Sequence, residues 1–166
     1  GAYGNTDTAE LSTKLVLTYT AGAGGSISGL TPQAVESGED GAEVLAVPDA
    51  CYHFVSWSDG VLTPARTDLA VTSDLTVEAT FAIDQQTLTY SAGANGSLTG
   101  LTSQVVNCGT DGTEVVAVPD ACYHFVSWSD GVLTAARTDL SVTDDLTVEA
   151  TFAIDQQTLT YTAGAN

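Results

Sequence analysis

The sequence has few positive charges and no methionine. Lys and Arg number 3 against 21 Asp and Glu, which gives a formal net charge of -18. Such an excess of negative charge repels phosphate backbones and anionic lipid headgroups. We therefore expect neither a nucleic-acid partner nor insertion into a membrane.

Long apolar runs and helical periodicity are also missing. No stretch approaches the roughly 20 apolar residues that a membrane-spanning helix needs. No window places apolar residues at i, i+3, i+4 and i+7, as an amphipathic helix would. The chain also has no phosphate loop, no Gly-x-Ser-x-Gly and no paired carboxylates at a recognisable catalytic spacing. These absences predict a protein that is not an enzyme and uses no cofactor.

What the chain does contain is an internal repeat of 71 residues. The sequence that starts at Leu17 returns at Leu88, and a third start appears at Leu159. The two full copies differ at only about fourteen positions, which indicates duplication of a whole folding unit. We divide the chain into a non-repeat segment 1–14, repeats 15–86 and 87–157, and a final segment 158–166 that is the first strand of a further repeat or a donor strand.

Within a repeat the pattern has a period of two. In the run Leu75 to Phe81, apolar and polar residues alternate, which is typical of a half-buried strand. Gly-containing turn signals, among them Asp40-Gly41 and Asp111-Gly112, separate several such runs. The strands expected in the first repeat lie near 15–21, 26–29, 33–36, 43–47, 52–57, 67–71 and 75–81, with equivalents 71 residues later. The sequence therefore predicts an all-β fold.

Two details refine this picture. The spacing of Tyr52, Phe54 and Trp57 breaks strict alternation, and a bulge near 55–56 would return Trp57 to the face of Phe54. The junction 81–87 contains no Gly, Pro or Ser, which favours a stiff connection of continuous strand. We expect tandem small β-modules stacked into a rod.

One long motif resembles a known family. The run Gln-x-Val-x-x-Gly-x-x-Gly-x-x-Val-x-Ala-Val-Pro-x-x-x-Tyr-His-Phe-x-x-Trp-Ser-Asp-Gly occupies 33–60 and again 104–131, and Arg66-Thr-Asp68 follows it. It resembles the divergent internalin-type B repeats of bacterial surface proteins. The resemblance implies a compact β-rich module, β-grasp-like or related, in a secreted or cell-wall protein. It brings no catalytic residues.

The three cysteines allow a disulfide in an oxidising compartment. Cys108 and Cys122 flank the Asp111-Gly112 turn, which should make their strands antiparallel neighbours, so we predict a bond between them. The alternative is a pair of buried free thiols. Ser37 stands where the second repeat has Cys108, so Cys51 is predicted to be an unpaired buried thiol, or else to bond another chain.

Metal and nucleophile chemistry have weak support. Cys51 with His53, and Cys122 with His124, would each give only two zinc ligands, so no metal is expected. The acidic turns match no calcium loop, and solvated carboxylates are the simpler interpretation. A nucleophilic Cys-His pair lacks an orienting residue.

Aromatic and basic residues are assigned mainly structural roles. Trp57 and Trp128 should pack in the core, and the alternative is a platform for sugar rings. Arg66 and Arg137 should each pair with a nearby Asp. Lys14 is the only lysine, and an isopeptide cross-link through it is an alternative to a plain surface charge.

These observations favour a structural, extracellular repeat protein: a stalk or adhesin spacer, or a subunit of a self-associating fibre on the bacterial surface. The alternative is a module that binds a glycan or a host protein. At the end of the sequence Leu159, Tyr161 and Ala163 form an apolar strand face that would add to the sheet of a neighbouring molecule, head to tail. A cut from a longer array explains the same fragment equally well.

Overall fold

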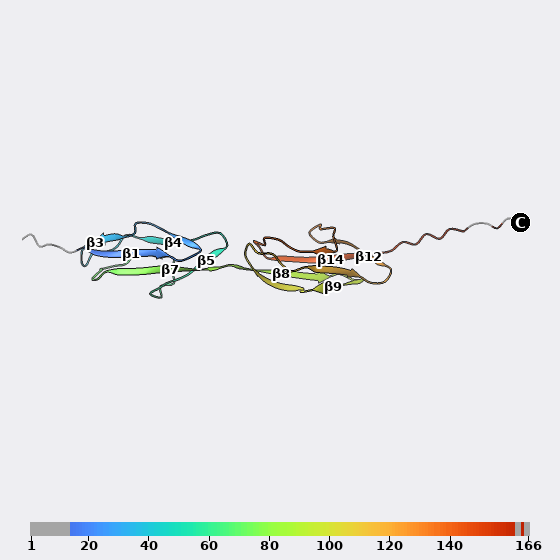
Figure 1. Cartoon of the computed structure of the whole chain (residues 1–166), viewed down its shortest axis with the longest axis horizontal. Coiled ribbons are helices and arrows are strands. Elements are labelled where there is room, and N and C mark those ends of the chain that lie inside the picture. Colours follow the sequence, from blue (N-terminus) through green and yellow to red (C-terminus); the bar gives the residue numbers. More distant parts are fainter. Residues whose placement is uncertain (1–13, 162–163, 165–166) are drawn as a thin grey trace, which may run out of the picture. The chain divides into compact units, whose positions relative to one another are not determined.

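The computed structural model describes residues 14–161 and residue 164, and its elements in that part are all strands (Figure 1). The prediction of an all-β fold is confirmed. Among these residues there is no helix with the length and apolar character needed to cross a membrane. The chain forms two compact units, Gly1–Ile83 and Asp84–Asn166, and each is described separately below.

The first unit is built on a four-stranded mixed sheet in the order β3-β1-β7-β5. The strands are β1 (Leu15–Ala21), β3 (Gln33–Val35), β5 (Tyr52–Trp57) and β7 (Leu75–Ile83). The edge strands β3 and β5 run antiparallel to their neighbours, whereas the two central strands, β1 and β7, run parallel. The first and last strands of the repeat therefore lie side by side in the middle of the sheet.

A smaller antiparallel sheet, in the order β2-β4-β6, covers one face of the first. Its strands are β2 (Gly25–Ser28), β4 (Val44–Pro48) and β6 (Ala65–Arg66). Alternate residues of β4 point inward, so that Val44 and Ala46 are buried while Leu45 and Val47 are exposed. The repeat is thus a small two-layer β-sandwich.

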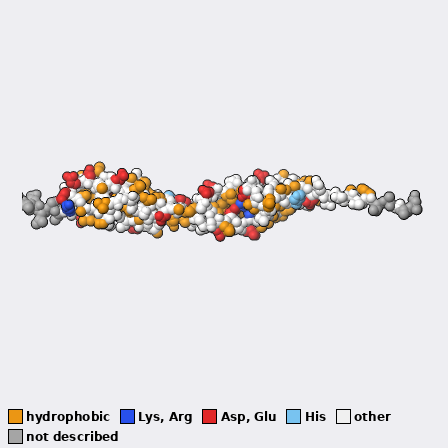
Figure 2. Space-filling model, turned by 90° about the horizontal axis from the view of Figure 1, so that it is seen from above, with side chains coloured by type: hydrophobic (Ala, Val, Ile, Leu, Met, Phe, Trp, Pro, Cys, Tyr) orange, Lys and Arg blue, Asp and Glu red, His pale blue; other side chains and the backbone are white. Residues whose placement is uncertain are grey.

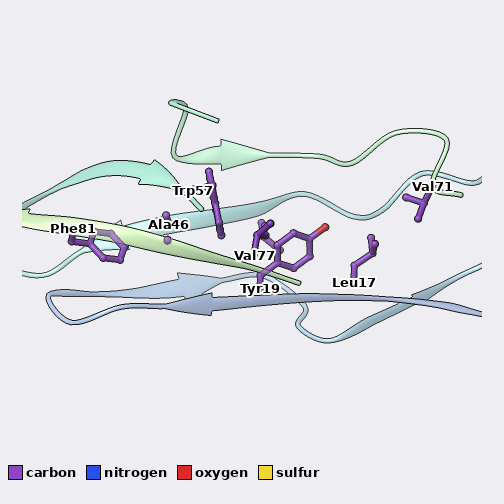
Figure 3. Packing of buried hydrophobic residues seen from close by; sticks show 9 residues of the cluster. Leu17, Tyr19, Ala46, Trp57, Val71, Val77 and Phe81 are labelled. Atoms are coloured by element: carbon purple, nitrogen blue, oxygen red, sulfur yellow. The ribbon is translucent and has the colours of Figure 1, made fainter. Parts of the chain in front are cut away.

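The core lies between the two sheets and consists of alternate residues of their strands (Figure 3). The alternation of Leu75 to Phe81 is reproduced in the burial of β7, whose Val77, Ala79 and Phe81 face inward. Trp57 is the largest fully buried side chain of the unit, and its ring meets that of Tyr19 edge to face with centroids 6.0 Å apart. A 70-residue module needs such large side chains inside, because its core is small.

The predicted bulge is present. The pairing of β5 with β7 shifts register between Phe54 and Ser56, where Val55 is the extra residue. The shift returns Trp57 to the face that Phe54 occupies, and the two rings lie 6.1 Å apart.

The second unit repeats this architecture strand for strand, with sheets β10-β8-β14-β12 and β13-β11-β9. Its strands are β8 (Gln85–Ala92), β9 (Gly96–Gly100), β10 (Ser103–Asn107), β11 (Val115–Pro119), β12 (Tyr123–Trp128), β13 (Ala136–Arg137) and β14 (Leu146–Ile154). In chain order, β7 ends at Ile83 and β8 begins at Gln85, so one residue separates the last strand of one repeat from the first strand of the next.

Two expectations about the strands were wrong. The segment 67–71 is not a strand, because β6 is only the pair Ala65–Arg66 and the chain then forms a loop. The Asp111-Gly112 turn does not make its flanking strands antiparallel neighbours either, since β10 and β11 belong to different sheets. The same holds for Asp40-Gly41 between β3 and β4. The separation of β10 from β11 has a consequence for the cysteines.

Candidate functional site

The most highly organised polar group of the first repeat centres on Arg66 in β6. Its side chain is 5% exposed. The guanidinium donates to both carboxylate oxygens of Asp59 at 3.1 and 3.0 Å, and to both of Asp68 at 3.1 and 2.6 Å. All three of its nitrogens are used, which a lysine could not reproduce. The prediction that Arg66 pairs with a nearby Asp is confirmed.

Aromatic side chains complete the cluster. The Tyr19 hydroxyl donates to Asp68 Oδ2 at 2.7 Å, and the guanidinium carbon of Arg66 lies 5.7 Å from the centroid of the Tyr19 ring and 5.1 Å from that of Trp57. The Trp57 indole donates its N–H to the Thr63 carbonyl at 3.0 Å. The cluster therefore joins β1, β5, β6 and the loops beside them, and fixes the loop before β7 to the core.

Ionisation in the cluster follows from these contacts. Hydrogen bonds from Arg66 hold the pKa of Asp59 below its ordinary value, against a smaller opposing effect of burial. For Asp68, burial is the largest single influence and raises the pKa, but donors from Arg66 and Tyr19 together outweigh it, so the pKa is lowered. Burial, and then the hydrogen bond to Asp68, raise the pKa of Tyr19. Both carboxylates are thus charged and the phenol neutral at neutral pH.

The second repeat carries the same cluster. Arg137 donates to Asp130 at 3.2 and 2.9 Å and contacts Asp139, and the Tyr90 hydroxyl donates to Asp139 Oδ2 at 2.6 Å. The guanidinium carbon of Arg137 is 5.1 Å from the centroid of the Trp128 ring, the same distance as between Arg66 and Trp57 in the first repeat. Every hydrogen-bonding group is occupied by a protein partner, so the arrangement stabilises a fold rather than presenting a free acid or base.

A buried glutamine in each repeat was not recognised as important from the sequence. Gln33 is 3% exposed, and its amide donates to the carbonyls of Leu30 and Ala42 while its oxygen accepts from the Ala42 N–H. Gln104 makes the equivalent bonds. The recurrence of Gln at the start of the long motif was the available signal. Its role is to hold the strand-free segment between β3 and β4 against the sheet.

The aromatic platform considered for sugar binding is not available at Trp57 and Trp128. Each indole is 1% exposed. Their assignment to the core is confirmed, and the binding alternative built on these two residues is wrong. The exposed apolar side chains include the loop leucines Leu62 and Leu133, and orange hydrophobic atoms are visible on the surface of both repeats in Figure 2.

The predicted cysteine pairing is wrong. Cys122 is a free, exposed thiol, so it forms no bond with Cys108, and Cys51, which was predicted to be unpaired, is disulfide-bonded. The reason lies in the strand order of the four-stranded sheet of the second unit. Cys108 directly follows β10, Cys122 directly precedes β12, and these are opposite edges of the sheet β10-β8-β14-β12. Three strand spacings of about 4.8 Å separate such edges, far beyond the Cα–Cα limit of about 7 Å for a disulfide.

In the described part of the chain, no group of three or more His, Cys, Asp or Glu side chains could hold a metal ion. The Nδ1 atom of His124 lies 2.9 Å from Asp155 Oδ1. Two surface depressions, of about 270 and 200 Å³, lie over corresponding loops of the two repeats. Lys14 lies 3.9 Å from Glu36 in an exposed ion pair.

The predicted donor strand is only partly described. Leu159 and Tyr161 are 75% and 86% exposed and lie in a stretch without strand structure, while Ala163 falls outside the described residues. Strand donation by these three residues stays a prediction. So does a cross-link at Lys14.

Comparison with known families gives one result. The profile described as the divergent InlB B-repeat domain matches residues 15–85 and again 86–156. No curated protein and no solved structure matches the chain.

Proposed function

Because the chain belongs to the divergent InlB B-repeat family, a family of bacterial surface repeats, we propose that it is an extracellular spacer whose repeats resist a pulling force. This proposal assigns no catalytic activity to it. A spacer requires modules that can be added without altering the next one, and the two repeats here have the same strands, the same core and the same polar cluster.

The observation that carries the proposal is the parallel pairing of the first and last strands of each repeat. In the first repeat, Leu17 to Ala21 of β1 pair with Leu75 to Ala79 of β7. In the second, β8 and β14 pair in the same way. Parallel strands point in one direction, so the chain enters the pair at one end and leaves it at the other.

This geometry decides how tension acts on the sheet. A force that pulls the two ends of a repeat apart is directed along the strands and loads the whole β1·β7 ladder in shear. Several hydrogen bonds must then break together. If the same strands were pulled apart from one end, the bonds would break one after another, at a lower force. The repeat is thus oriented to resist tension along the chain.

Other features add to this resistance. The Arg66 cluster fixes the loop that precedes β7, because Asp68 belongs to that loop while Tyr19 belongs to β1. Val16, also in β1, donates its N–H to Asp74 Oδ1 at 2.8 Å, just before β7 begins. These contacts tie the two central strands together at the end where peeling would start.

Single-molecule force spectroscopy tests the proposal. In a full-length chain with all three cysteines replaced by serine, attachment points introduced as Lys14→Cys and Asp84→Cys load the first repeat from end to end. The control uses Lys14→Cys with Ser73→Cys, which pulls β1 and β7 apart from their common starting end. We expect a several-fold higher unfolding force in the end-to-end geometry. Equal forces in the two geometries would contradict a force-resisting role.

A further inference from the structure

Strand β10 lies at one edge of the four-stranded sheet of the second unit, where β8 is its one neighbour among the described strands. Two hydrogen bonds fix the direction of its backbone groups. The Tyr90 N–H donates to the Thr102 carbonyl at 2.9 Å, and the Cys108 N–H donates to the Asp84 carbonyl at 2.8 Å. Bonding residues alternate along an antiparallel ladder, so the even-numbered residues of β10 face β8. The residues whose backbone groups point away from β8 are Ser103, Val105 and Asn107.

These three outward positions all differ from the first repeat, whereas the two positions between them do not. Gln33 and Val35 of β3 return unchanged as Gln104 and Val106. The outward positions of the first repeat hold Pro32, Ala34 and Glu36. A proline, which has no N–H to donate, and a charged side chain are both features that keep a sheet edge from pairing with another strand. The edge of the second repeat has neither.

The chain around this edge is also uncharged. Residues 85–110 contain no Asp, Glu, Lys, Arg or His, although the formal net charge of the chain is -18. The equivalent stretch of the first repeat, 14–39, contains Lys14, Glu36 and Glu39. Two copies of so acidic a chain repel each other wherever their carboxylates meet. An uncharged sheet edge is therefore a place where two copies can approach.

We propose that β10 is a dimerisation edge, which pairs antiparallel with β10 of a second copy of this chain. Ser103 and Val105 each present an N–H and a C=O for this pairing. Asn107 presents its N–H, because its carbonyl already accepts from the Thr110 N–H at 3.0 Å. The Val105 side chain, which is 63% exposed, gains a cross-strand neighbour from the second copy.

This contact uses the same strand on both molecules, so it is isologous and stops at two copies, whereas head-to-tail addition would continue. It joins two chains side by side through their second repeats. The pairing does not depend on the mechanical role proposed above.

Sedimentation equilibrium of the full chain tests the proposal, over concentrations that resolve micromolar to millimolar dissociation constants. We expect a monomer–dimer equilibrium that tightens as salt is added, because salt screens the repulsion between two acidic chains. The triple variant Ser103→Pro, Val105→Ala and Asn107→Glu gives β10 the outward residues of β3. It should weaken the dimer by about tenfold or more.

Asn107→Glu alone should also weaken the dimer, and Thr147→Glu is its matched control. Thr147 is exposed on the central strand β14, so this control adds the same charge to the same sheet away from its edge and should leave the dissociation constant nearly unchanged. Circular dichroism and tryptophan emission like those of the unsubstituted chain show that each variant folds.

Isotope-filtered nuclear Overhauser effects in a mixture of labelled and unlabelled chains identify the partner strand. They should connect residues 103–107 of one molecule with residues 103–107 of the other. The proposal is overturned if the chain stays monomeric at every concentration, or if both β10 variants dimerise like the unsubstituted chain. Equal weakening by Thr147→Glu, or contacts from 103–107 to another segment such as 158–166, would overturn it as well.

Discussion

The guanidinium carbon of Arg66 lies 5.1 Å from the centre of the Trp57 ring, with two carboxylates bound at its edge. A positive charge in this position is held between the core and the surface: the indole packs on its face, and Asp59 and Asp68 neutralise it. The first repeat therefore depends on one arginine to connect its aromatic core with its acidic loops.

Replacement of that arginine should weaken the first repeat selectively. Arg66→Ala leaves Asp59 and Asp68 close together without a cation, and the loss of one partner of a buried ion pair costs about 3 kcal/mol or more. Because a module of this size has a total stability of only about 3–5 kcal/mol, we expect the first repeat to unfold at much lower urea concentrations than the second. Tryptophan fluorescence should show two separate transitions.

The matched control is Lys14→Ala, which removes an exposed ion pair and should leave the urea midpoint nearly unchanged. Arg137→Ala should reproduce the effect in the other repeat. A single unshifted transition in Arg66→Ala would contradict the assigned role.

Acid should destabilise both repeats through the same clusters. The pKa values of Asp59, Asp68 and Asp130 are lowered in the folded state, whereas an unfolded Asp titrates near pH 3.9. Their contribution to stability is therefore complete above about pH 4 and is lost as the pH falls through the lowered folded-state values. When unfolding is measured from pH 7 to pH 2, the urea concentration at the midpoint should decrease once the pH is below about 4. Combining Asp59→Asn with Asp130→Asn should make that fall shallower, and an unchanged slope would argue against the linkage.

Removal of one hydroxyl group tests the bond between Tyr19 and Asp68. In Tyr19→Phe the ring still fills the core, but the 2.7 Å hydrogen bond is lost. Hydrogen bonds to charged acceptors contribute about 1.5–3 kcal/mol, so a loss in that range is expected in urea unfolding of the first repeat. Tyr161→Phe is the control, because the Tyr161 side chain is 86% exposed. Equal stability of the two variants would show that the bond contributes nothing.

Close packing at Gly25 gives a steric prediction. A Cβ atom there would lie 2.4 Å from Phe81 Cζ, although the backbone of Gly25 itself would accept a side chain. Gly25→Ala should therefore displace the Phe81 ring and cost about 1–3 kcal/mol, measured by thermal or urea unfolding. Gly164→Ala meets no atom within 4 Å and should be neutral. A neutral Gly25→Ala would mean that the ring moves without loss of packing.

Local pattern predicted local structure well. The alternation in 15–21 and 75–81 identified the two central strands, and the broken alternation at Trp57 identified the bulge. The strands and the bulge can be predicted because they depend on which face of a strand each side chain occupies. That face is determined by the pattern of a few neighbouring residues.

The pairing of strands that are distant in the sequence could not be predicted from such local patterns. β1 pairs with β7, some 58 residues later, and no local signal encodes this. The turn at Asp111-Gly112 was interpreted as a hairpin because that is the commonest use of such a dipeptide. Its strands enter different sheets, and the error in the cysteine pairing followed directly.

The last prediction concerns the segment 158–166. In the two repeats, the leucine and tyrosine of the sequence Leu-Thr-Tyr are buried in a central strand, with Leu17 and Leu88 at 0% exposure. Leu159 and Tyr161 have the same sequence context but are 75% and 86% exposed. Burial of one such side chain is worth about 1.5–3 kcal/mol, so this segment gains free energy from any sheet that accepts it.

An acceptor would have to offer a free edge, because the central position is already filled in both repeats by β1 or β8. The edge strands β3, β5, β10 and β12 are the candidates in a neighbouring molecule. Strand addition of this kind links molecules head to tail and predicts concentration-dependent association, which sedimentation velocity would detect. Deletion of 158–166 should abolish the association, and the double variant Leu159→Ser with Tyr161→Ser should weaken it, since it removes the apolar face but keeps the backbone donors. If the deleted chain associates as the full chain does, the contact lies elsewhere and this segment serves only as the start of another repeat.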